Sequence, residues 1–224
     1  MAATAPSTVS KNWITNGRLA KNWDRGVKSY PVAMAYGVVV FGTDNRKMYK
    51  HMAEVGKLPD GTSVLDVPSG GGVVLLGLKP ENRITYTAAD ISPVMLERVR
   101  DEATRRGLDY VSTQEADAGN LPFEDATFDV VVSYSGLHCV PDPAKAVAEI
   151  ARVVKPGGTV RGSVVVRKAG FVPDRFIDLW VKLNILDVVT PVDTVFGWFE
   201  DAGLTRVASS TSGAVLYFEY TKAQ

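Results

Sequence analysis

The chain has 224 residues, of which 46% are hydrophobic and 22% are charged. This length and apolar fraction suit one compact α/β domain, and they exclude a disordered or low-complexity chain. The 25 basic and 25 acidic residues cancel, so composition gives no sign of nucleic-acid binding. A single cysteine, Cys139, excludes an internal disulfide and a thiolate zinc cage. No apolar run is long enough to span a membrane, and the polar first residues lack the apolar stretch of a signal peptide. We therefore expect a cytoplasmic protein, monomeric or homodimeric, that binds a small molecule.

Aromatic residues mark the N-terminal part of the chain, where residues 12–58 are expected to form a helical cap. From residue 62 onward, strand and helix patterns alternate. The expected strands are 64–67, 84–89, 110–115, 128–133 and 159–166, and the expected helices between them are 73–78, 93–107 and 142–154. After these elements come an amphipathic stripe at 170–190, a helix at 193–202, and a hairpin formed by 204–209 and 214–220.

This order predicts an α/β fold with a doubly wound, mostly parallel, seven-stranded sheet that ends in an antiparallel hairpin and carries a helical cap. We expect a single domain over residues 1–224. Within it, 60–166 form a cofactor-binding core, 170–190 a lid insert, and 193–224 the final helix and hairpin.

Two aspartates and a glycine cluster fall where ligands bind in such sheets, at the carboxyl ends of the strands. Gly70 and Gly72 follow the first strand and let a ligand approach the backbone closely. Asp90 ends the second strand, at a distance that suits an acid accepting both hydroxyls of a ribose. The carboxylate of Asp66, at the mouth of the first strand, would repel a pyrophosphate and attract an ammonium group. A ligand with adenosine at one end and an amino acid at the other, such as S-adenosylmethionine, satisfies both aspartates.

The ordered motifs resemble those of class I S-adenosylmethionine-dependent methyltransferases, of the small-molecule type related to the quinone-biosynthesis enzymes. The resemblance is close over residues 60–166 and looser over the final hairpin. The segments that carry it are VLDVPSGGG at 64–72, EADA at 115–118, NLPF at 120–123, FD at 128–129, LH at 137–138 and VKPGG at 154–158. One departure is Pro68, which stands where the family usually has glycine and removes a backbone donor. We therefore expect the methionine end of the cofactor to be held differently.

The resemblance implies a Rossmann-like fold that transfers a methyl group to a small, apolar or aromatic molecule. The implied donor is S-adenosyl-L-methionine, the product is S-adenosyl-L-homocysteine, and no metal takes part. The residues implied in cofactor binding are Asp66, Pro68, Ser69, Gly70, Gly72, Asp90, Ile91, Met95, Asp117, Ala118, Ser133 and Tyr134, with Asp117 expected to receive the adenine amino group. The acceptor-binding candidates are Trp23, Tyr30, His138, Phe176 and Trp180.

His138 is the candidate general base. Methyl transfer is an in-line displacement from an activated donor, so alignment and exclusion of water can suffice without a catalytic dyad. An acceptor that reacts through oxygen would use a base such as His138, whereas an amine or carbanion-like acceptor would not. The aromatic residues of the cap and the lid insert are interpreted either as a second core or as a lid over an apolar pocket.

Several alternatives stay open at this point. The same fold and cofactor can serve cyclisation or elimination, without loss of the methyl group. A nicotinamide-dependent oxidoreductase is disfavoured because Leu75 holds the third glycine position of the dinucleotide fingerprint. A non-catalytic interaction module would not need an intact glycine loop. At the residue level, Asp66 and Asp90 can instead cap turns, and His51 and Cys139 are expected to be packing residues.

Overall fold

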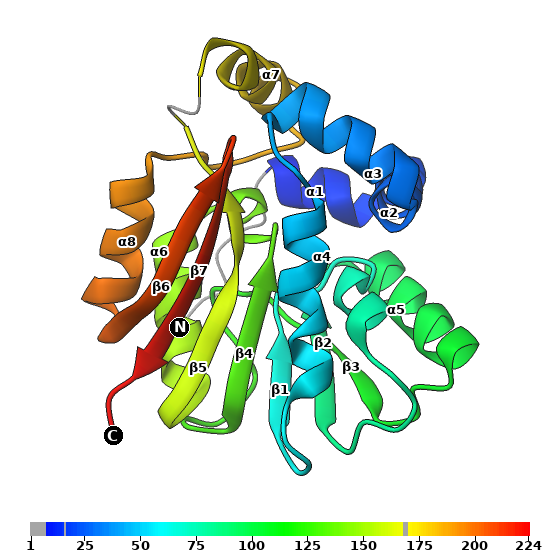
Figure 1. The fold of residues 1–224 in the computed structure, drawn as a ribbon, viewed down its shortest axis with the longest axis vertical. Coiled ribbons are helices and arrows are strands. Elements are labelled where there is room, and N and C mark those ends of the chain that lie inside the picture. Colours follow the sequence, from blue (N-terminus) through cyan, green and yellow to red (C-terminus); the bar gives the residue numbers. More distant parts are fainter. Residues whose placement is uncertain (1–7, 16, 168–169) are drawn as a thin grey trace.

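The computed structural model describes residues 8–15, 17–167 and 170–224. Figure 1 shows a twisted central sheet with helices on both faces and a further helical layer above one end of the strands. The sheet confirms the predicted seven strands, which are β1 (Ser63–Asp66), β2 (Thr85–Asp90), β3 (Val111–Glu115), β4 (Phe128–Tyr134), β5 (Val154–Val165), β6 (Leu204–Ser212) and β7 (Val215–Lys222).

The strands lie in the order β3-β2-β1-β4-β5-β7-β6. The pairs from β3 to β5 are parallel, and β7 pairs antiparallel with both β5 and β6. Starting from β1, successive strands are added first on one side, as β2 and β3, and then on the other, as β4 and β5. Ligands bind in open α/β sheets at this change of side, between β1 and β4. Because these strands are parallel, the ends that carry Asp66, Asp90 and Tyr134 meet at the same edge.

The helices form two groups. Those before the first strand are α1 (Thr8–Thr15), α2 (Gly17–Lys28), α3 (Tyr30–Tyr36), the π-helix η1 (Gly37–Phe41), α4 (Arg46–Ala53) and the 3-10 helix η2 (Val55–Lys57). Those after it are η3 (Val73–Gly77), α5 (Pro93–Arg106), η4 (Leu137–Cys139), α6 (Pro143–Val153), α7 (Phe171–Lys182) and α8 (Val192–Asp201). We call α1–α3, η1 and α7 the cap layer, because they lie together above the carboxyl ends of the strands (Figure 1).

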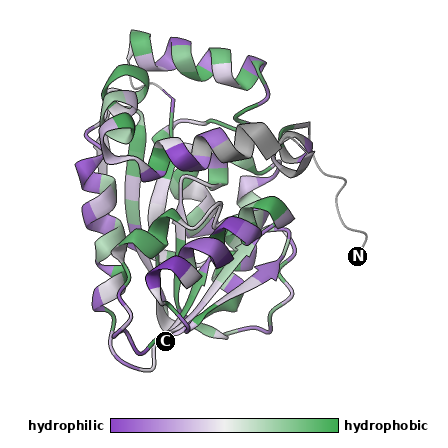
Figure 2. Ribbon diagram, turned by 90° about the vertical axis from the view of Figure 1, so that its right-hand side faces the viewer, coloured by the Kyte–Doolittle hydropathy of each residue, from purple (hydrophilic) through white to green (hydrophobic). Residues whose placement is uncertain are grey.

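Buried side chains form one hydrophobic cluster on each face of the sheet. Val130 and Val132 of β4 contribute to the cluster beneath α4 and α5, and Val131 between them contributes to the cluster beneath α6 and α8. This alternation follows from the two-residue period of a strand. Figure 2 shows the matching pattern, with hydrophobic colour on the strands and hydrophilic colour along the outer faces of the helices. Within the described ranges, no helix is both long and apolar enough to cross a membrane.

Three expected elements differ from the structure. The helix expected at 73–78 is only the short 3-10 helix η3, because Gly72 enters it with a left-handed φ of 80° and Leu78 leaves it extended. β5 begins at Val154 rather than at 159, since Val154 already pairs with Phe128 before a shift in register. The stripe at 170–190 is helical only as far as Lys182.

The turn between β6 and β7 is bonded to the cap layer. The amide of Ala214 donates to the carbonyl of Phe41 over 2.8 Å, and the Thr43 hydroxyl donates to Ser212 Oγ over 2.9 Å. Gly213 is required at this contact, because a Cβ there would overlap the backbone of Phe41 and Gly42, and its φ is 54°. The last hairpin therefore braces the segment that follows η1.

Candidate active site

A cavity of about 100 Å³ opens at the carboxyl ends of β1, β2 and β4. We call it the aspartate cavity. Six of the residues predicted to bind the cofactor line it, namely Pro68, Asp90, Ile91, Met95, Asp117 and Ala118. Its other lining residues are Trp13, Val67, Ala116, Ser135, Gly136, Cys139, Val140 and Pro141. Half of the twelve residues predicted to bind the cofactor therefore lie around this one cavity.

Asp90 is fixed by the backbone at the floor of this cavity. Its Oδ2 accepts the amide of Gly70 over 2.8 Å, and its Oδ1 accepts the amide of Ser92 over 2.9 Å. Burial raises the pKa of Asp90 to about 6, and the amide hydrogen bonds oppose that shift. The group is therefore mostly ionised at neutral pH. A carboxylate has about four lone-pair directions, and the backbone amides do not use all of them, so a ligand's hydroxyl group can also be accepted.

The glycine loop leaves room on its outer side. Gly70 has a φ of 52°, and a Cβ built on it would meet no other atom within 4 Å. The amide of Ser69 donates to the carbonyl of Ala89 over 2.9 Å, which ties the loop to β2. An open backbone of this kind lets a ligand lie directly against the loop.

Helix α2 packs on the other side of the same loop through a buried ion cluster. Lys28 Nζ donates to the carbonyl of Gly71 over 2.7 Å and lies 2.9 Å from Asp24 Oδ1. Arg98 of α5 approaches the second oxygen of Asp24 at 3.3 Å. A Cβ on Gly71 would overlap the Asp24 carboxylate, so only glycine permits this close approach. The cluster therefore fixes the position of the loop from behind.

Asp66 lies deeper than the sequence suggested, and it is not among the residues that line the aspartate cavity. Its side chain is buried, and its Oδ2 accepts the hydroxyl of Tyr86 over 2.7 Å. Burial raises the pKa of Asp66 to about 7; the Tyr86 bond lowers it and the nearby Asp90 raises it further. Asp66 therefore titrates close to neutral pH in the protein.

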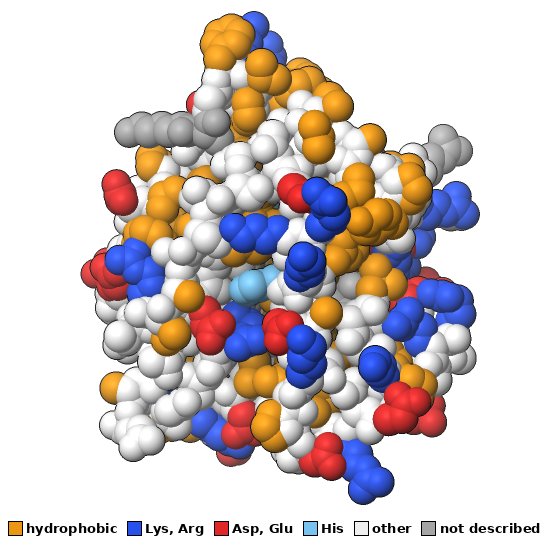
Figure 3. All heavy atoms as spheres, viewed as in Figure 1, with side chains coloured by type: hydrophobic (Ala, Val, Ile, Leu, Met, Phe, Trp, Pro, Cys, Tyr) orange, Lys and Arg blue, Asp and Glu red, His pale blue; other side chains and the backbone are white. Residues whose placement is uncertain are grey.

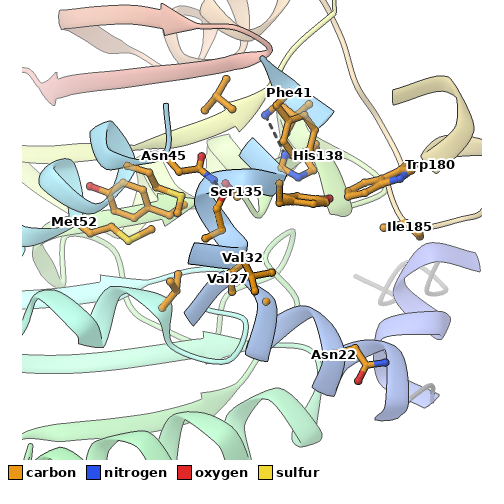
Figure 4. Close-up of a pocket in the computed structure, with 18 residues that line it drawn as sticks. Asn22, Val27, Val32, Phe41, Asn45, Met52, Ser135, His138, Trp180 and Ile185 are labelled. Carbon is orange, nitrogen blue, oxygen red and sulfur yellow. Dashed lines mark hydrogen bonds between the residues drawn. The ribbon is translucent and has the colours of Figure 1, made fainter. Parts of the chain in front are cut away.

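A second, larger cavity of about 390 Å³ lies between the sheet edge and the cap layer. We call it the aromatic cavity. It is lined by Asn22, Gly26, Val27, Val32, Ala33, Tyr36, Phe41, Asn45, Met48, Met52, Val73, Tyr134, Ser135, His138, Val165, Trp180, Ile185 and Val215. Figure 4 shows Phe41 and Trp180 on one side of this space and Met52 and Asn45 on the other. Most of the lining is apolar, so the cavity suits an apolar ligand.

The aromatic wall is built by ring contacts within the cap layer, between α3, η1 and α7. The Trp180 ring stacks on Tyr36 with 5.3 Å between centroids and meets Phe41 edge-on at 5.6 Å. The lid insert predicted from the sequence thus contributes Trp180 to the cavity wall.

Ser135 lines both cavities, which therefore adjoin at the end of β4. It has a φ of 53°, an uncommon value for a residue other than glycine. Its amide is bonded to the carbonyl of Ser163 at 2.8 Å, and the chain after it passes so close to Pro68 that Gly136 has no room for a side chain. Strained backbone of this kind concentrates at functional sites.

His138 is buried in η4 and faces the aromatic cavity (Figure 4). Its Nδ1 accepts the amide of Val165 over 3.1 Å. Burial lowers the pKa of His138 to about 4, so the ring is neutral at neutral pH. A neutral imidazole carries its proton on one nitrogen, and because Nδ1 is the acceptor, that proton is on Nε2.

Tyr134, predicted to bind the cofactor, lines the aromatic cavity instead. Its hydroxyl lies 2.8 Å from His51 Nδ1 and 3.1 Å from the His51 carbonyl. Burial raises the pKa of Tyr134 and lowers that of His51, so both groups are neutral at neutral pH. His51, predicted as a packing residue, therefore positions a cavity side chain.

Apart from Trp23, the remaining predicted residues lie outside both cavities. Ser69, Gly70 and Gly72 belong to the loop itself, Ser133 is buried within β4 opposite Gly162, and Phe176 packs against the core. Tyr30 is 53% exposed and contacts the ring of Tyr49. Trp23 belongs to α2, and its side chain lies outside the described part of the structure.

Sequence reasoning missed the residues that follow β4. Gly136, Val140 and Pro141 line the aspartate cavity, as does Cys139, which was expected to be a buried filler. Burial raises the pKa of the Cys139 thiol to about 12, so it stays protonated. The rule that ligands bind at the carboxyl ends of strands would have found this segment, because it begins where β4 ends.

Comparison with known proteins identifies the class of domain. Residues 65–161 match the family model described as a methyltransferase domain. The 27-O-demethylrifamycin SV methyltransferase of Amycolatopsis mediterranei is 37% identical over 106 residues, which are 46% of this chain and 39% of the relative. The 2-methyl-6-phytyl-1,4-hydroquinone methyltransferase 1 of Oryza sativa subsp. japonica is 30% identical over 158 residues, 70% of this chain and 45% of the relative. The solved structure of the [4+2]-cyclase SpnF shares the fold, with a TM-score of 0.67 and 22% identity over 80% of this chain and 81% of that one.

The chain thus contains a methyltransferase domain on a Rossmann-like fold, which confirms the resemblance inferred from the motifs. It spans less than half the length of the two curated relatives described above. The match favours methyl transfer over the nicotinamide-dependent alternative.

Proposed function

We propose that the protein is an S-adenosylmethionine-dependent methyltransferase (EC 2.1.1 type) whose methyl acceptor is a small apolar or aromatic molecule. The observation that carries this proposal is the junction of the two cavities at Ser135, one lined by fixed aspartates and the other by aromatic side chains. A donor held in the first cavity and an acceptor held in the second would meet at that point.

The residues of the aspartate cavity fit the proposed cofactor. Asp90 has free lone pairs for ribose hydroxyls, and Ile91 and Met95 offer apolar surface for a purine. Asp117 Oδ1 accepts the amide of Gly119 over 2.9 Å, which leaves Oδ2 for the adenine amino group. The glycine loop suits the amino-acid end, and Asp66 lies buried behind the loop, where loss of its proton near neutral pH would give a negative charge opposite an ammonium group. When bound, the cofactor supplies a methyl group on a positively charged sulfur.

The chain's own residues contribute alignment and exclusion of water. Ser135 lies where the two cavities meet. The acceptor side is enclosed by Trp180, Phe41 and Tyr36. Proximity and orientation of this kind are worth about 7–11 kcal/mol of a reaction barrier. His138 does not serve as the base in this proposal, because the nitrogen that could take a proton already accepts the Val165 amide.

Mass spectrometry of product mixtures tests the proposal. The protein is incubated with methyl-deuterated S-adenosylmethionine and a panel of hydroquinones, phenols and terpenoid alcohols. We expect S-adenosylhomocysteine to form together with an acceptor that has gained one labelled methyl group. Conversion of an acceptor with no gain in mass indicates cyclisation, and a loss of mass without methylation indicates elimination; either outcome contradicts the proposal.

Calorimetry with S-adenosylhomocysteine separates the remaining alternative. An enzyme of the proposed kind binds this product in a 1:1 ratio even when its acceptor is missing from the panel. A non-catalytic interaction module would bind neither the cofactor nor its product. Absence of binding therefore contradicts the cofactor assignment, independently of the choice of acceptors.

A further inference from the structure

His138 is the buried polar group in the aromatic cavity that the proposed methyl transfer leaves without a role. The side chain is 1% exposed to solvent, yet it lines a cavity of about 390 Å³ whose walls are mostly apolar. A polar group in such a place is costly unless it has a partner. The partner of each ring nitrogen therefore decides what the residue does.

One nitrogen of the ring is already assigned by the fold. Val165 is the last residue of β5, and its amide donates to His138 Nδ1 over 3.1 Å (dashed in Figure 4). An amide nitrogen has no lone pair to offer, so Nδ1 is the acceptor in this bond. η4 is further held by the amide of Asp187, which donates to the His138 carbonyl over 2.8 Å. The ring thus has a fixed orientation and a fixed tautomer.

The other nitrogen, Nε2, carries the proton, and among residues 8–15, 17–167 and 170–224 the hydrogen bond at Nδ1 is the only one that the ring makes. The ring stays neutral at neutral pH, because burial lowers its pKa to about 4. Nε2–H is therefore a permanent, directed donor rather than a site that gains and loses a proton.

We infer that His138 binds an oxygen atom of the acceptor molecule through Nε2–H, so that the aromatic cavity selects apolar molecules with a carbonyl, phenolate or hydroxyl oxygen. This inference rests on the proposed function, in which the aromatic cavity holds the methyl acceptor. It gives His138 a positioning role: the hydrogen bond fixes where the oxygen lies relative to Ser135, at the junction with the aspartate cavity. A hydrocarbon without oxygen fills the same space but leaves Nε2–H unpaired, which is the loss that makes buried donors selective.

The tautomer can be measured directly. The chain has only two histidines, so nitrogen-15 NMR of histidine-labelled protein gives two sets of ring signals, and the variant His51→Gln assigns them. At pH 7 we expect His138 to be neutral, with the proton on Nε2 and with Nδ1 unprotonated. A proton on Nδ1, or a charged ring at pH 7, overturns the inference.

Binding of matched probes tests the selectivity. 1-Tetralone, a bicyclic aromatic ketone, and tetralin, its hydrocarbon counterpart, are titrated by calorimetry into the protein and its variants. In His138→Asn, the shorter amide can keep an acceptor near the Val165 amide but no longer reaches the cavity. We expect this variant to bind the ketone about three- to tenfold more weakly than the wild type does and to bind tetralin equally well. His138→Gln, whose amide nitrogen reaches the position of Nε2, should restore most of the ketone affinity.

The outcomes separate this inference from the proposed function. Equal loss of both probes in His138→Asn shows a packing role and overturns the inference, as does failure of the ketone to bind the wild type. Neither NMR nor the probe titrations need cofactor or turnover. A protein that fails to bind S-adenosylhomocysteine but passes both tests therefore contradicts the methyltransferase proposal alone.

Discussion

Asp66 combines a proposed role in cofactor binding with an unfavourable environment for its charge. Its carboxyl is buried and meets a single hydroxyl, that of Tyr86, so its pKa rises from 3.8 to about 7. Between these two pH values the folded protein holds a proton that the unfolded chain releases. The free energy of unfolding contributed by this group is therefore greatest below about pH 4 and falls as the pH rises to 7.

The substitution Asp66→Asn isolates this effect. The asparagine side chain can still accept the Tyr86 hydroxyl but is never charged, so we expect the variant to be more stable than the wild type at pH 7.5, by up to a few kcal/mol, and about equal to it at pH 4. Its affinity for S-adenosylhomocysteine should fall, because the ammonium group loses its opposite charge. Thermal unfolding of the cofactor-free proteins and calorimetry measure the two effects, with the exposed Asp60→Asn as the control. A variant no more stable than the wild type at pH 7.5 would show that burial does not destabilise the charged form of Asp66.

Asp90 is expected to be the stronger determinant of cofactor binding. In Asp90→Ala the ribose loses its acceptors, and the amides of Gly70 and Ser92 lose theirs, so the loop loosens as well. Hydrogen bonds to a charged group are worth about 1.5–3 kcal/mol, which predicts at least a tenfold loss of S-adenosylhomocysteine affinity. Calorimetry compares this variant with Asp109→Ala, an exposed aspartate whose loss should leave the affinity unchanged. Unaltered binding in Asp90→Ala would contradict the assigned site.

At the scale of elements, the glycine loop depends on the helix behind it. Lys28 and Asp24 are 15% and 8% exposed, whereas the ion pair between Lys57 and Glu54 is 67% and 48% exposed. Removing one partner of a buried pair leaves an uncompensated charge, while an exposed pair contributes at most about 1 kcal/mol. Lys28→Met leaves Asp24 with Arg98 as a partner and removes the donor to the Gly71 carbonyl, so it should destabilise the protein by about 1–3 kcal/mol and weaken S-adenosylhomocysteine binding. The matched Lys57→Met should do neither.

Urea unfolding and calorimetry on both variants check this prediction. The informative comparison is between the two lysines, because they remove the same charge from the same chain. Equal, small effects would show that the contact with Gly71 does not support the loop.

Helix α7, in the insert expected to form a lid, carries two aromatic residues that differ in exposure. Trp180 stacks on Tyr36 and lines the aromatic cavity, whereas Phe171 is 80% exposed. Figure 3 shows hydrophobic side chains gathered at the upper end of this face, over α7. Trp180→Ala should raise the KM for the methyl acceptor several-fold and leave the affinity for S-adenosylhomocysteine unchanged, while Phe171→Ala should change neither.

Steady-state kinetics with the acceptor found in the product screen measure the first effect, and calorimetry measures the second. A parallel loss of acceptor and cofactor affinity in Trp180→Ala, together with a lower melting temperature, would instead identify α7 as packing for the whole fold. The comparison with Phe171→Ala excludes a general effect of shortening an aromatic side chain on this helix.

At the scale of the whole molecule, the sheet and the aspartate cavity could be predicted from the sequence, because the residue patterns that indicate them are local. A strand, a glycine loop and an acid at the end of the next strand have a fixed spacing, and the parallel topology then brings Asp90 and Asp117 to one edge. Capping residues are equally local: Pro93 begins α5 and Gly107, with a φ of 67°, ends it as expected.

The aromatic cavity could not be predicted from the sequence in the same way. Its walls come from the π-helix, the lid and the last strand, which meet only after the chain has folded, so Asn45, Met48 and Val215 carry no local signal of their role. The role of His138 likewise depends on Val165, a residue 27 positions away whose amide fixes the tautomer. A histidine near a cleft suggests a base, and only the hydrogen bond shows which nitrogen is free to act.

The contact between the last hairpin and the segment after η1 makes the aromatic cavity depend on the end of the chain. Among the residues that the structure describes, those that line the aspartate cavity lie between Trp13 and Pro141, so the growing chain contains that set while the last third is still being made. The aromatic cavity needs Val215, and the Gly213 turn meets Phe41 only when β6 and β7 exist. Because a chain is synthesised from its amino end, the described residues that line the donor side are all made before the last strand, which completes the acceptor side. The apolar lining of the aromatic cavity is therefore complete only when the final strand is in place.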